Sequence, residues 1–315
     1  MPEIDALVAR LRLPVVVAPM FLVSGPELVI ASCRAGLVGS FPAANARTVD
    51  VLDDWMGRIR REVGAAPWAL NLVVHPTYNP LFPDQLDMLE QHRPPIVITS
   101  LGQPGPVVER VHAFGGLVFH DVTTQRHAEK AIEAGVDGLI LVTSGAGGHC
   151  GDLHPFVFVP QIRRHWDGAV LLAGAISDGP AILATQALGA DLAYMGTRFA
   201  ATQESMAHAE YKQLLVQQGA ADIVVTDRIS GVQAAFMRGS LERVGLDPDH
   251  LPSLRGPHQP NLPDHVKPWR DAWSAGQGVE LIDDVPTVSS LVDRLEREYR
   301  DARAALCDHG DASHA

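Results

Sequence analysis

The sequence predicts an α/β protein whose core is a (β/α)8 TIM barrel, with a smaller inserted segment before a C-terminal helix. Eight short runs are apolar at nearly every position instead of alternating, which is typical of parallel strands buried on both faces. They begin about 21 to 32 residues apart, close to the length of one β/α unit. Eight such units close a barrel, and an open, doubly wound sheet is the alternative.

The predicted strands cover residues 15–20, 36–41, 68–74, 95–101, 117–122, 138–143, 170–175 and 192–197. Segments with helical periodicity lie between them. Helix-start signals precede three of these segments, at residues 24–27, 48–50 and 123–124. Several helices stop at a glycine shortly before the next strand, as at Gly36, Gly135 and Gly189, because a C-terminal cap favours this residue.

The pattern changes after residue 197. Residues 198–219 have helical spacing of apolar side chains, and residues 246–269 contain six prolines, too many for regular structure. A charged amphipathic helix over residues 289–306 follows, which we expect to pack on the barrel or on a partner subunit. We therefore predict a barrel over residues 1–203, an inserted lid or substrate subdomain, mostly helical or irregular, over 204–277, and a C-terminal helix segment, 278–315, that returns to the barrel.

The composition indicates a globular protein and limits its partners. Hydrophobic residues make up 46% of the chain, enough for a sizeable core, and the mean hydropathy is +0.06. Acidic residues outnumber basic ones by 37 to 25, which disfavours nucleic acid as a partner. Three widely separated cysteines, no signal-like start and no long apolar run predict a cytoplasmic protein that spans no membrane.

The ends of the last two predicted strands suggest a phosphate site. In a barrel of this kind the active site lies at the carboxyl ends of the strands. Strand seven ends in Ala173, Gly174 and Ala175, and strand eight runs into Gly196 and Thr197. Small residues before a helix let backbone amides approach a phosphate, and these two loops are the usual phosphate site of such barrels. A phosphorylated ligand is favoured, with ordinary tight turns as the alternative.

A glycine-rich loop after the sixth predicted strand presents a histidine. Four glycines, Gly148 among them, surround His149 within residues 143–151 and allow a planar ligand to approach the backbone closely. Because its ordinary pKa is near neutrality, His149 is a candidate general acid or base; a surface histidine without function is the alternative. Neighbouring Cys150 and Asp152 complete no usual zinc spacing, so we expect no metal.

Two polar residues interrupt the apolar strands. Asn71 lies in the third strand and His120 in the fifth, and a buried polar side chain requires a hydrogen-bond partner. The edge of a bound ring system would provide one for Asn71. For His120, a structural hydrogen bond to a neighbouring strand is at least as good an explanation.

Taken together, several segments resemble the nitronate monooxygenase family, whose members are FMN-dependent (β/α)8 barrels related to FMN-dependent enoyl reductases. The resemblance covers most of the chain. It rests on APM at residues 18–20, Asn71, the GAGGHCG loop around His149, AGAISDG at 173–179, MGTRFAAT at 195–202 and WSAGQGVELIDDVP at 273–286.

The resemblance implies FMN as the cofactor. It implies a phosphate held by Ala173, Gly174, Ala175, Gly196 and Thr197, and a ring system lined by Ala18, Met20 and Asn71. His149 would be catalytic, taking the α-proton of a neutral nitroalkane or binding an anionic nitronate. Molecular oxygen would be the co-substrate, and the products would be a carbonyl compound and nitrite. Gln277 would reach the flavin as well.

The chain departs from the family pattern at two positions. Ala175 stands where relatives often have a second glycine, and Asp121 stands where a lysine can follow the strand-five histidine. An acidic Asp121 near the ring would disfavour an anionic reduced flavin, unless the carboxylate points away or pairs with a cation.

Three functions compete at this point. The first is FMN-dependent oxidation of alkyl nitronates. The second is NAD(P)H-dependent reduction of quinones or activated alkenes by a flavin on the same barrel, since fold and cofactor do not decide the chemistry. The third is a flavin-free barrel that binds a sugar phosphate or serves as a non-catalytic binding protein. We expect a small-molecule substrate, and we leave open whether the chain forms a homodimer.

Overall fold

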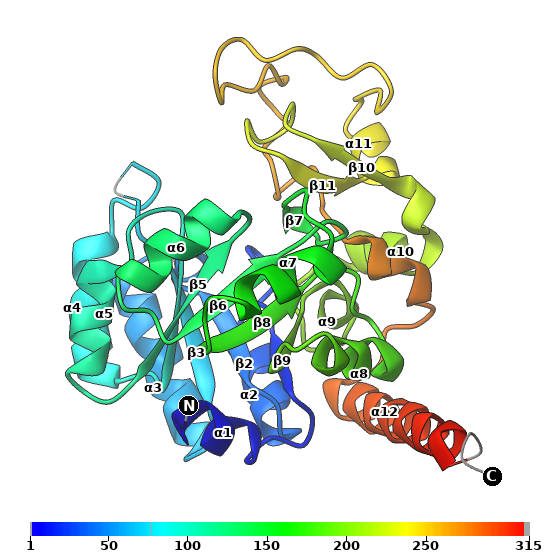
Figure 1. Cartoon of the computed structure of the whole chain (residues 1–315). Helices are drawn as coiled ribbons and strands as arrows, with labels where there is room; N and C mark the ends of the chain where they lie inside the picture. The colour runs from blue at the N-terminus through cyan, green and yellow to red at the C-terminus, as the bar shows by residue number, and fades with distance from the viewer. Residues whose placement is uncertain (1, 76, 312–315) are drawn as a thin grey trace.

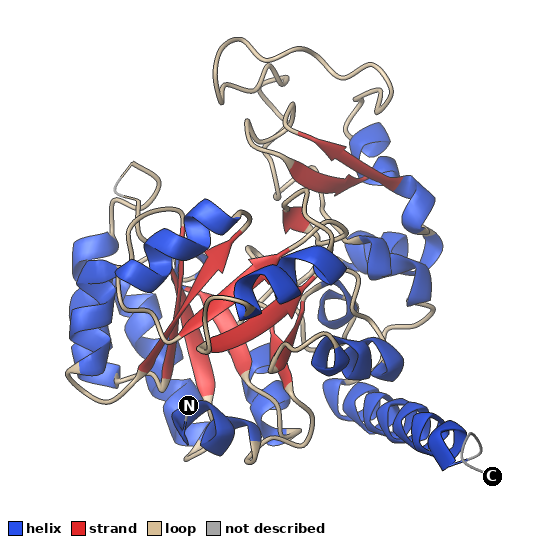
Figure 2. Cartoon of the chain, in the orientation of Figure 1, coloured by secondary structure: helices blue, strands red, loops and turns tan. Residues whose placement is uncertain are grey.

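A closed barrel of eight parallel strands forms the centre of the computed structural model, which describes residues 2–75 and 77–311 (Figures 1 and 2). Its strands are β1 (Val15–Val17), β2 (Gly39–Pro42), β3 (Trp68–Val73), β4 (Ile96–Ser100), β5 (Leu117–Val122), β6 (Gly138–Val142), β8 (Ala169–Ala173) and β9 (Leu192–Met195). They pair in the order β1-β9-β8-β6-β5-β4-β3-β2. A parallel bridge between Val16 and Val38 joins β1 to the start of β2 and closes the ring. The predicted (β/α)8 barrel is therefore confirmed.

Helices cover the outside of the barrel between successive strands. They are α2 (Pro26–Arg34), α3 (Val49–Val63), α4 (Phe82–His92), α5 (Gly105–His112), α6 (Gln125–Glu133), α7 (Pro155–Arg163) and α8 (Gly179–Ala187). The side chains of Thr48 and Thr124 cap α3 and α6, as their positions predict. Ser24 does not cap α2. Its hydroxyl accepts from the amide of Met20 at 2.9 Å and so stabilises the turn after β1, where the short helix η1 (Ala43–Asn45) also packs.

The inside of the barrel is a packed apolar core. Val16, Ile98, Phe119 and Leu171 belong to this cluster, each contributed by a different strand. The N-terminal helix α1 (Pro2–Val8) lies under the amino-terminal end of the barrel, and its apolar side chains join the same cluster (Figure 1). The bottom of the barrel is therefore closed by apolar packing, and only the carboxyl end is left to hold a ligand.

The single helix predicted over residues 198–219 is wrong, because two short helices occupy this stretch. They are α9 (Thr197–Ala200) and α10 (Ala209–Gln217). The Thr202 hydroxyl donates to the carbonyl of Phe199, and the Ser205 hydroxyl donates to that of Ala200, both at 2.7 Å. Side-chain donors thus occupy carbonyls that a continuous helix would pair with its own amides.

A small antiparallel sheet, which the sequence did not predict, lies above the barrel mouth in Figure 1. It pairs β10 (Ile223–Thr226) with β11 (Ala234–Met237), and β11 with β7 (Gly148–His149). The helices η2 (Ala220–Asp222) and α11 (Arg238–Arg243) flank it. Residues 244–276, all of them described, contain no helix and no strand beyond isolated bridges, as the prolines predict. Whether 204–277 acts as a lid stays a prediction.

The chain returns to the barrel through η3 (Gln277–Leu281) and α12 (Val288–Asp311). The α12 helix lies against α8, and the approach is close enough that a Cβ on Gly179 would overlap the backbone of Tyr299. Its buried side is formed by Val288, Leu291, Val292 and Leu295, which pack into the apolar core around the barrel. No helix in the described part of the chain is both long and apolar enough to cross a membrane.

Candidate active site

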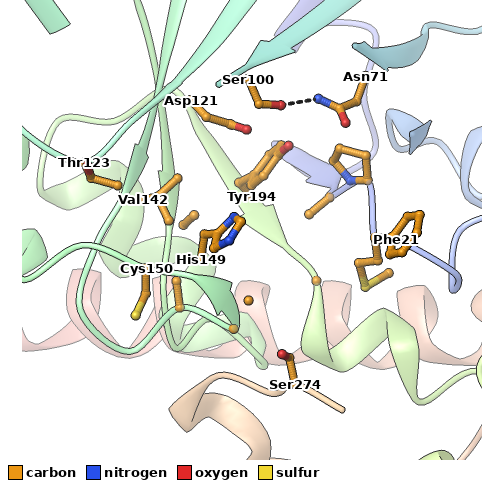
Figure 3. A pocket seen from close by; sticks show the side chains of 18 of the residues that line it. Phe21, Asn71, Ser100, Asp121, Thr123, Val142, His149, Cys150, Tyr194 and Ser274 are labelled. Carbon is orange, nitrogen blue, oxygen red and sulfur yellow. Dashed lines mark hydrogen bonds between the residues drawn. The ribbon is translucent and has the colours of Figure 1, made fainter. Parts of the chain in front are cut away.

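A cavity of about 930 Å³ opens at the carboxyl ends of the barrel strands. Its wall is built from the loops after nearly every strand and from the small antiparallel sheet (Figure 3). All ten residues predicted for the site line it: Ala18, Met20, Asn71, Gly148, His149, Ala173, Gly174, Ala175, Gly196 and Thr197. Residues from five different segments of the sequence are thereby brought to one place.

The loop between β8 and α8 offers a cradle for an anion. Within the described chain, the backbone amides of Ala175, Ile176 and Ser177 donate no hydrogen bond, and the buried hydroxyl of Ser177 has no partner. Gly174 has a φ of +138°, and a Cβ there would overlap the Thr143 hydroxyl. Successive free amides with an unpartnered hydroxyl are the donors that a phosphate group requires.

Two backbone amides in the first turn of α8 already donate hydrogen bonds within the protein. The Asp178 carboxylate accepts from the amide of Ala181 at 2.8 Å, and Glu298 of α12 accepts from that of Gly179 at 3.0 Å. The free donors therefore belong to the loop before the helix. Ala175, the residue that replaces a family glycine, has a φ of +54°, so its backbone adopts the left-handed conformation in spite of its side chain.

Three loops meet where β9 ends. The Thr197 hydroxyl accepts from the amide of Gly276 at 3.0 Å, and Gln277 donates its amide to the carbonyl of Gly145 at 2.9 Å. A Cβ on Gly276 would crowd the same Gly145 carbonyl. The GAGGHCG loop is thus fastened to the segment around residue 276. The side chain of Gln277 is exposed and is not among the residues that line the cavity.

Inward-pointing polar side chains form the floor of the cavity. Asn71 donates from Nδ2 to the Ser100 hydroxyl at 2.7 Å and to the carbonyl of Ile98 at 3.2 Å. This leaves the amide oxygen of Asn71 to accept from a ligand. Asp121 and Tyr194 lie beside Ser100 (Figure 3). The barrel core is therefore capped by hydrogen-bonding groups that suit the edge of a polar ring.

His149 projects into the same cavity and appears below Asp121 and Tyr194 in the view of Figure 3. Strand β7 fixes its backbone by pairing it with Ala234, and the imidazole stands edge-on to Trp269 with ring centroids 5.1 Å apart. The ring reaches the solvent of the cavity but is enclosed by protein on most sides, and this burial lowers its pKa below the ordinary value of 6.5. His149 is therefore a neutral imidazole at pH 7.

The other polar candidates are explained by structure. His120 contacts the Thr99 hydroxyl on β4 through Nδ1 at 2.7 Å, and burial lowers its pKa to about 4, so the predicted structural hydrogen bond is present. Cys150 is buried, and burial raises the pKa of its thiol, which disfavours a nucleophilic role. No cluster of metal-ligating side chains occurs among residues 2–75 and 77–311.

Sequence reasoning missed several residues of this cavity. Tyr194 and Ser100 were hidden inside strands, where alternation of inward and outward positions could have identified them. Trp269 lies in the proline-rich stretch, and no local signal connects it to His149. Phe21, Tyr78 and Leu101 form an exposed apolar rim, which becomes visible only when the loops are assembled.

The fold and the cavity define the class of protein: an α/β-barrel enzyme with a site large enough for a nucleotide-sized cofactor and a small substrate. The family model described as nitronate monooxygenase matches residues 76–298. The chain therefore belongs to the nitronate monooxygenase family. It is an oxidoreductase, the members of its family are flavoenzymes, and the family chemistry is oxidation of nitronates.

Individual relatives agree with this assignment at modest identity. The nitronate monooxygenase of Paraburkholderia phytofirmans is 28% identical, with 91% of this chain and 92% of that protein covered. A Rhodococcus jostii protein, (3aS,4S,5R,7aS)-5-hydroxy-7a-methyl-1-oxo-octahydro-1H-indene-4-carboxyl-CoA dehydrogenase, is 27% identical over 77% of this chain and 67% of its own length. The curated relatives thus include two different chemistries.

Two solved structures have the same fold. Nitroalkane oxidase from Streptomyces ansochromogenes superposes with a TM-score of 0.79 at 26% identity, covering 96% of this chain and 99% of that one. FabK from Thermotoga maritima has a TM-score of 0.80 at 24% identity, with 98% of both chains covered, a likeness that concerns the fold alone.

Proposed function

We propose that this chain is an FMN-dependent enzyme that oxidises alkyl nitronates to carbonyl compounds and nitrite with molecular oxygen. The observation that carries the proposal is the arrangement of the cavity. An anion cradle with an unpartnered Ser177 hydroxyl lies at one end, a polar floor at Asn71 lies in the barrel mouth, and the neutral His149 faces it. These three features fit the phosphate, the ring edge and the substrate respectively.

The cofactor fits the residues that are present. The loop amides of Ala175, Ile176 and Ser177 would hold the phosphate, and a side chain on Gly174 would obstruct this loop. Ala18, Met20, Asn71 and Gly148 would contact the ring system, and Gly196 and Thr197 would complete the phosphate end. When bound, FMN supplies the acceptor for the electrons of the nitronate and the centre at which oxygen reacts.

The substrate role of His149 follows from its protonation state. A neutral imidazole with a lowered pKa can take the α-proton of a neutral nitroalkane, but it does not offer a positive charge to an anionic nitronate. Of the two roles implied by the family resemblance, the structure therefore favours the general base. Trp269, which contacts the imidazole edge-on and is stacked on Phe236 with ring centroids 4.9 Å apart, would hold the ring in position for this role.

The test is steady-state turnover of the FMN-loaded protein with primary nitronates, followed as oxygen consumption and nitrite release without added NAD(P)H. The proposal expects nitrite to appear in a constant ratio to oxygen consumed. A protein that binds FMN, consumes NADPH in the presence of quinones and leaves nitronates unchanged would overturn it.

A second candidate, an NAD(P)H-dependent reductase of quinones or activated alkenes, has one observation in its favour. The rim residues Phe21, Tyr78 and Leu101 are exposed at the mouth of a cavity of about 930 Å³, which accommodates substrates larger than a short nitronate. The relative named as a carboxyl-CoA dehydrogenase is consistent with this alternative. Stoichiometric loss of NADPH absorbance with menadione or a conjugated enone would favour it.

A further inference from the structure

The floor of the cavity contains a carboxyl group whose role the proposed function leaves open. Asp121 stands on β5, lines the cavity and projects into the barrel mouth beside Ser100 and Tyr194 (Figure 3). Its Oδ1 atom is shielded from solvent and has no hydrogen-bond partner in the described chain. The side chain therefore neither points away from the cavity nor pairs with a cation. Either arrangement would have kept a negative charge on Asp121 from disfavouring an anionic reduced flavin.

The surroundings of Asp121 stabilise its uncharged form. Burial raises the pKa of this carboxyl from 3.8 to about 7, and the hydrogen bond from the Ser100 hydroxyl offsets only part of the rise. The Ser100 hydroxyl is in turn engaged by Asn71. Around neutral pH a substantial fraction of Asp121 is thus the neutral acid, which carries a proton that it can donate.

No neighbouring charge alters this balance. Tyr194 faces Asp121 from β9, and burial together with the Asp121 charge raises the pKa of its phenol, so it is neutral too. His149 faces from β7 as a neutral ring. His120, on the same strand, is hydrogen-bonded to the Thr99 hydroxyl. His127 and Lys130 of α6 also line the cavity, but they do not contribute to the pKa shift of Asp121.

Building on the proposed FMN site, we propose that Asp121 is a protonated positioning residue that donates a hydrogen bond to an acceptor atom of the ring system bound above it. A flavin ring carries carbonyl oxygens and unprotonated ring nitrogens, which accept hydrogen bonds. The neutral acid satisfies one of them and gives the free Oδ atom a partner. The ionised carboxylate has no proton to donate, so its oxygen atoms would face the acceptor atoms of the ring without a hydrogen bond. It would also repel negative charge on a reduced ring.

FMN binding should then depend on the protonation of one group, the Asp121 carboxyl. If only the neutral acid binds the ring well and its pKa is about 7, affinity should fall about tenfold between pH 6 and pH 8 from this group alone. The FMN phosphate and other groups of the protein can also contribute to the pH dependence of binding. Their contributions are the same in a variant that changes only Asp121, so the comparison isolates the carboxyl.

The test is equilibrium binding of FMN to the apoprotein at pH 6 and pH 8, read from flavin fluorescence, in wild type, Asp121→Asn and the control Asp301→Asn. The side chain of Asp301 is exposed on α12, so the same replacement there does not touch the cavity. We expect the pH 8 to pH 6 ratio of Kd in wild type and Asp301→Asn to exceed that in Asp121→Asn by about tenfold. The asparagine can donate but cannot ionise.

A second variant keeps the test independent of how well Asp121→Asn folds. Removal of the Ser100 hydroxyl in Ser100→Ala takes away the bond that favours ionisation, so affinity should be lost at a higher pH than in wild type. Equal ratios in all variants, with FMN bound, would overturn the role of Asp121 and leave the proposed function standing. Failure of wild type to bind FMN at any pH would overturn the proposed function itself.

Discussion

The imidazole of His149 stands edge-on to the indole of Trp269, with 5.1 Å between ring centroids and an interplanar angle of 83°. The two residues are far apart in the sequence, and Trp269 is itself stacked on Phe236 of β11. The φ angle of Trp269 is +67°, which is uncommon for a bulky residue and indicates that the surrounding fold imposes this conformation. The proline-rich segment thus sets the orientation of the candidate base.

Replacement of Trp269 should therefore reduce turnover without removing the cofactor. In Trp269→Leu we expect kcat with a neutral nitroalkane to fall about tenfold, because the imidazole loses the edge contact that orients it. FMN affinity should stay within about twofold, since Trp269 is not one of the residues proposed to hold FMN. Trp166→Leu, a half-buried tryptophan beyond the other end of α7, is the matched control. Equal losses in both variants would mean general destabilisation.

The base role of His149 separates two kinds of substrate. In His149→Ala, kcat/KM for a neutral nitroalkane should fall by about 10²–10⁴, the usual contribution of a general base. A nitronate prepared in advance has already lost the proton, so its oxidation should fall far less. The measurement is nitrite release with nitroethane and with ethyl nitronate, at equal FMN occupancy. Unchanged activity on nitroethane would exclude His149 as the base.

The lowered pKa of His149 predicts the acid limb of the pH profile. The base must be unprotonated, so kcat/KM for a neutral nitroalkane should stay level as pH falls towards 6.5 and decline only below that value. The decline should approach tenfold per pH unit. The profile is measured with FMN at saturation, so that titration of Asp121 does not change occupancy. A midpoint above 6.5 would contradict the neutral imidazole described above.

The phosphate cradle predicts a difference between FMN and riboflavin. Ser177→Ala removes the unpartnered hydroxyl, and loss of one hydrogen bond to a charged group, about 1.5 to 3 kcal/mol, should weaken FMN binding roughly 10- to 100-fold. Riboflavin has no phosphate, so its affinity should not change. Gly174→Asp should expel FMN by charge and bulk. Equal weakening of both ligands in Ser177→Ala would place the phosphate elsewhere.

The buried carboxyl of Asp121 also predicts how stability depends on pH. Its pKa rises from 3.8 to about 7 on folding, so the folded state holds an extra proton between these values and loses stability as pH rises through them. The loss is at most about 4 kcal/mol. Apoprotein Asp121→Asn should therefore gain in melting temperature relative to wild type from pH 5 to pH 8. A constant difference across this range would contradict the raised pKa.

The barrel could be predicted from the sequence because each buried strand is apolar at nearly every position. All eight predicted strands exist, with ends that differ by a few residues. The site residues at Gly174 and His149 could be predicted for the same reason: they follow strands whose carboxyl ends meet at one face. At these two residues the local sequence pattern, a loop directly after an apolar strand, is enough to give the position in the folded barrel.

The features of the fold and the site that the sequence does not predict depend on tertiary contacts and on hydrogen bonds of individual side chains. Strand β7 is only two residues long and exists because Ala234 pairs with His149, so no local pattern predicts it. The break between α9 and α10 arises from side-chain bonds of Thr202 and Ser205. The raised pKa of Asp121 results from burial among residues of other strands. The sequence alone shows Asp121 only as a departure from the family pattern.

We propose that nitronate, and not NAD(P)H, delivers electrons to a flavin bound in this cavity. The most direct measurement is anaerobic stopped-flow absorbance of the FMN-loaded protein, mixed separately with propionate 3-nitronate and with NADPH. We predict that the flavin absorbance changes with the nitronate alone and is unaffected by NADPH. Rapid full reduction by NADPH, with no response to the nitronate, would exclude nitronate oxidation as the function and favour the reductase.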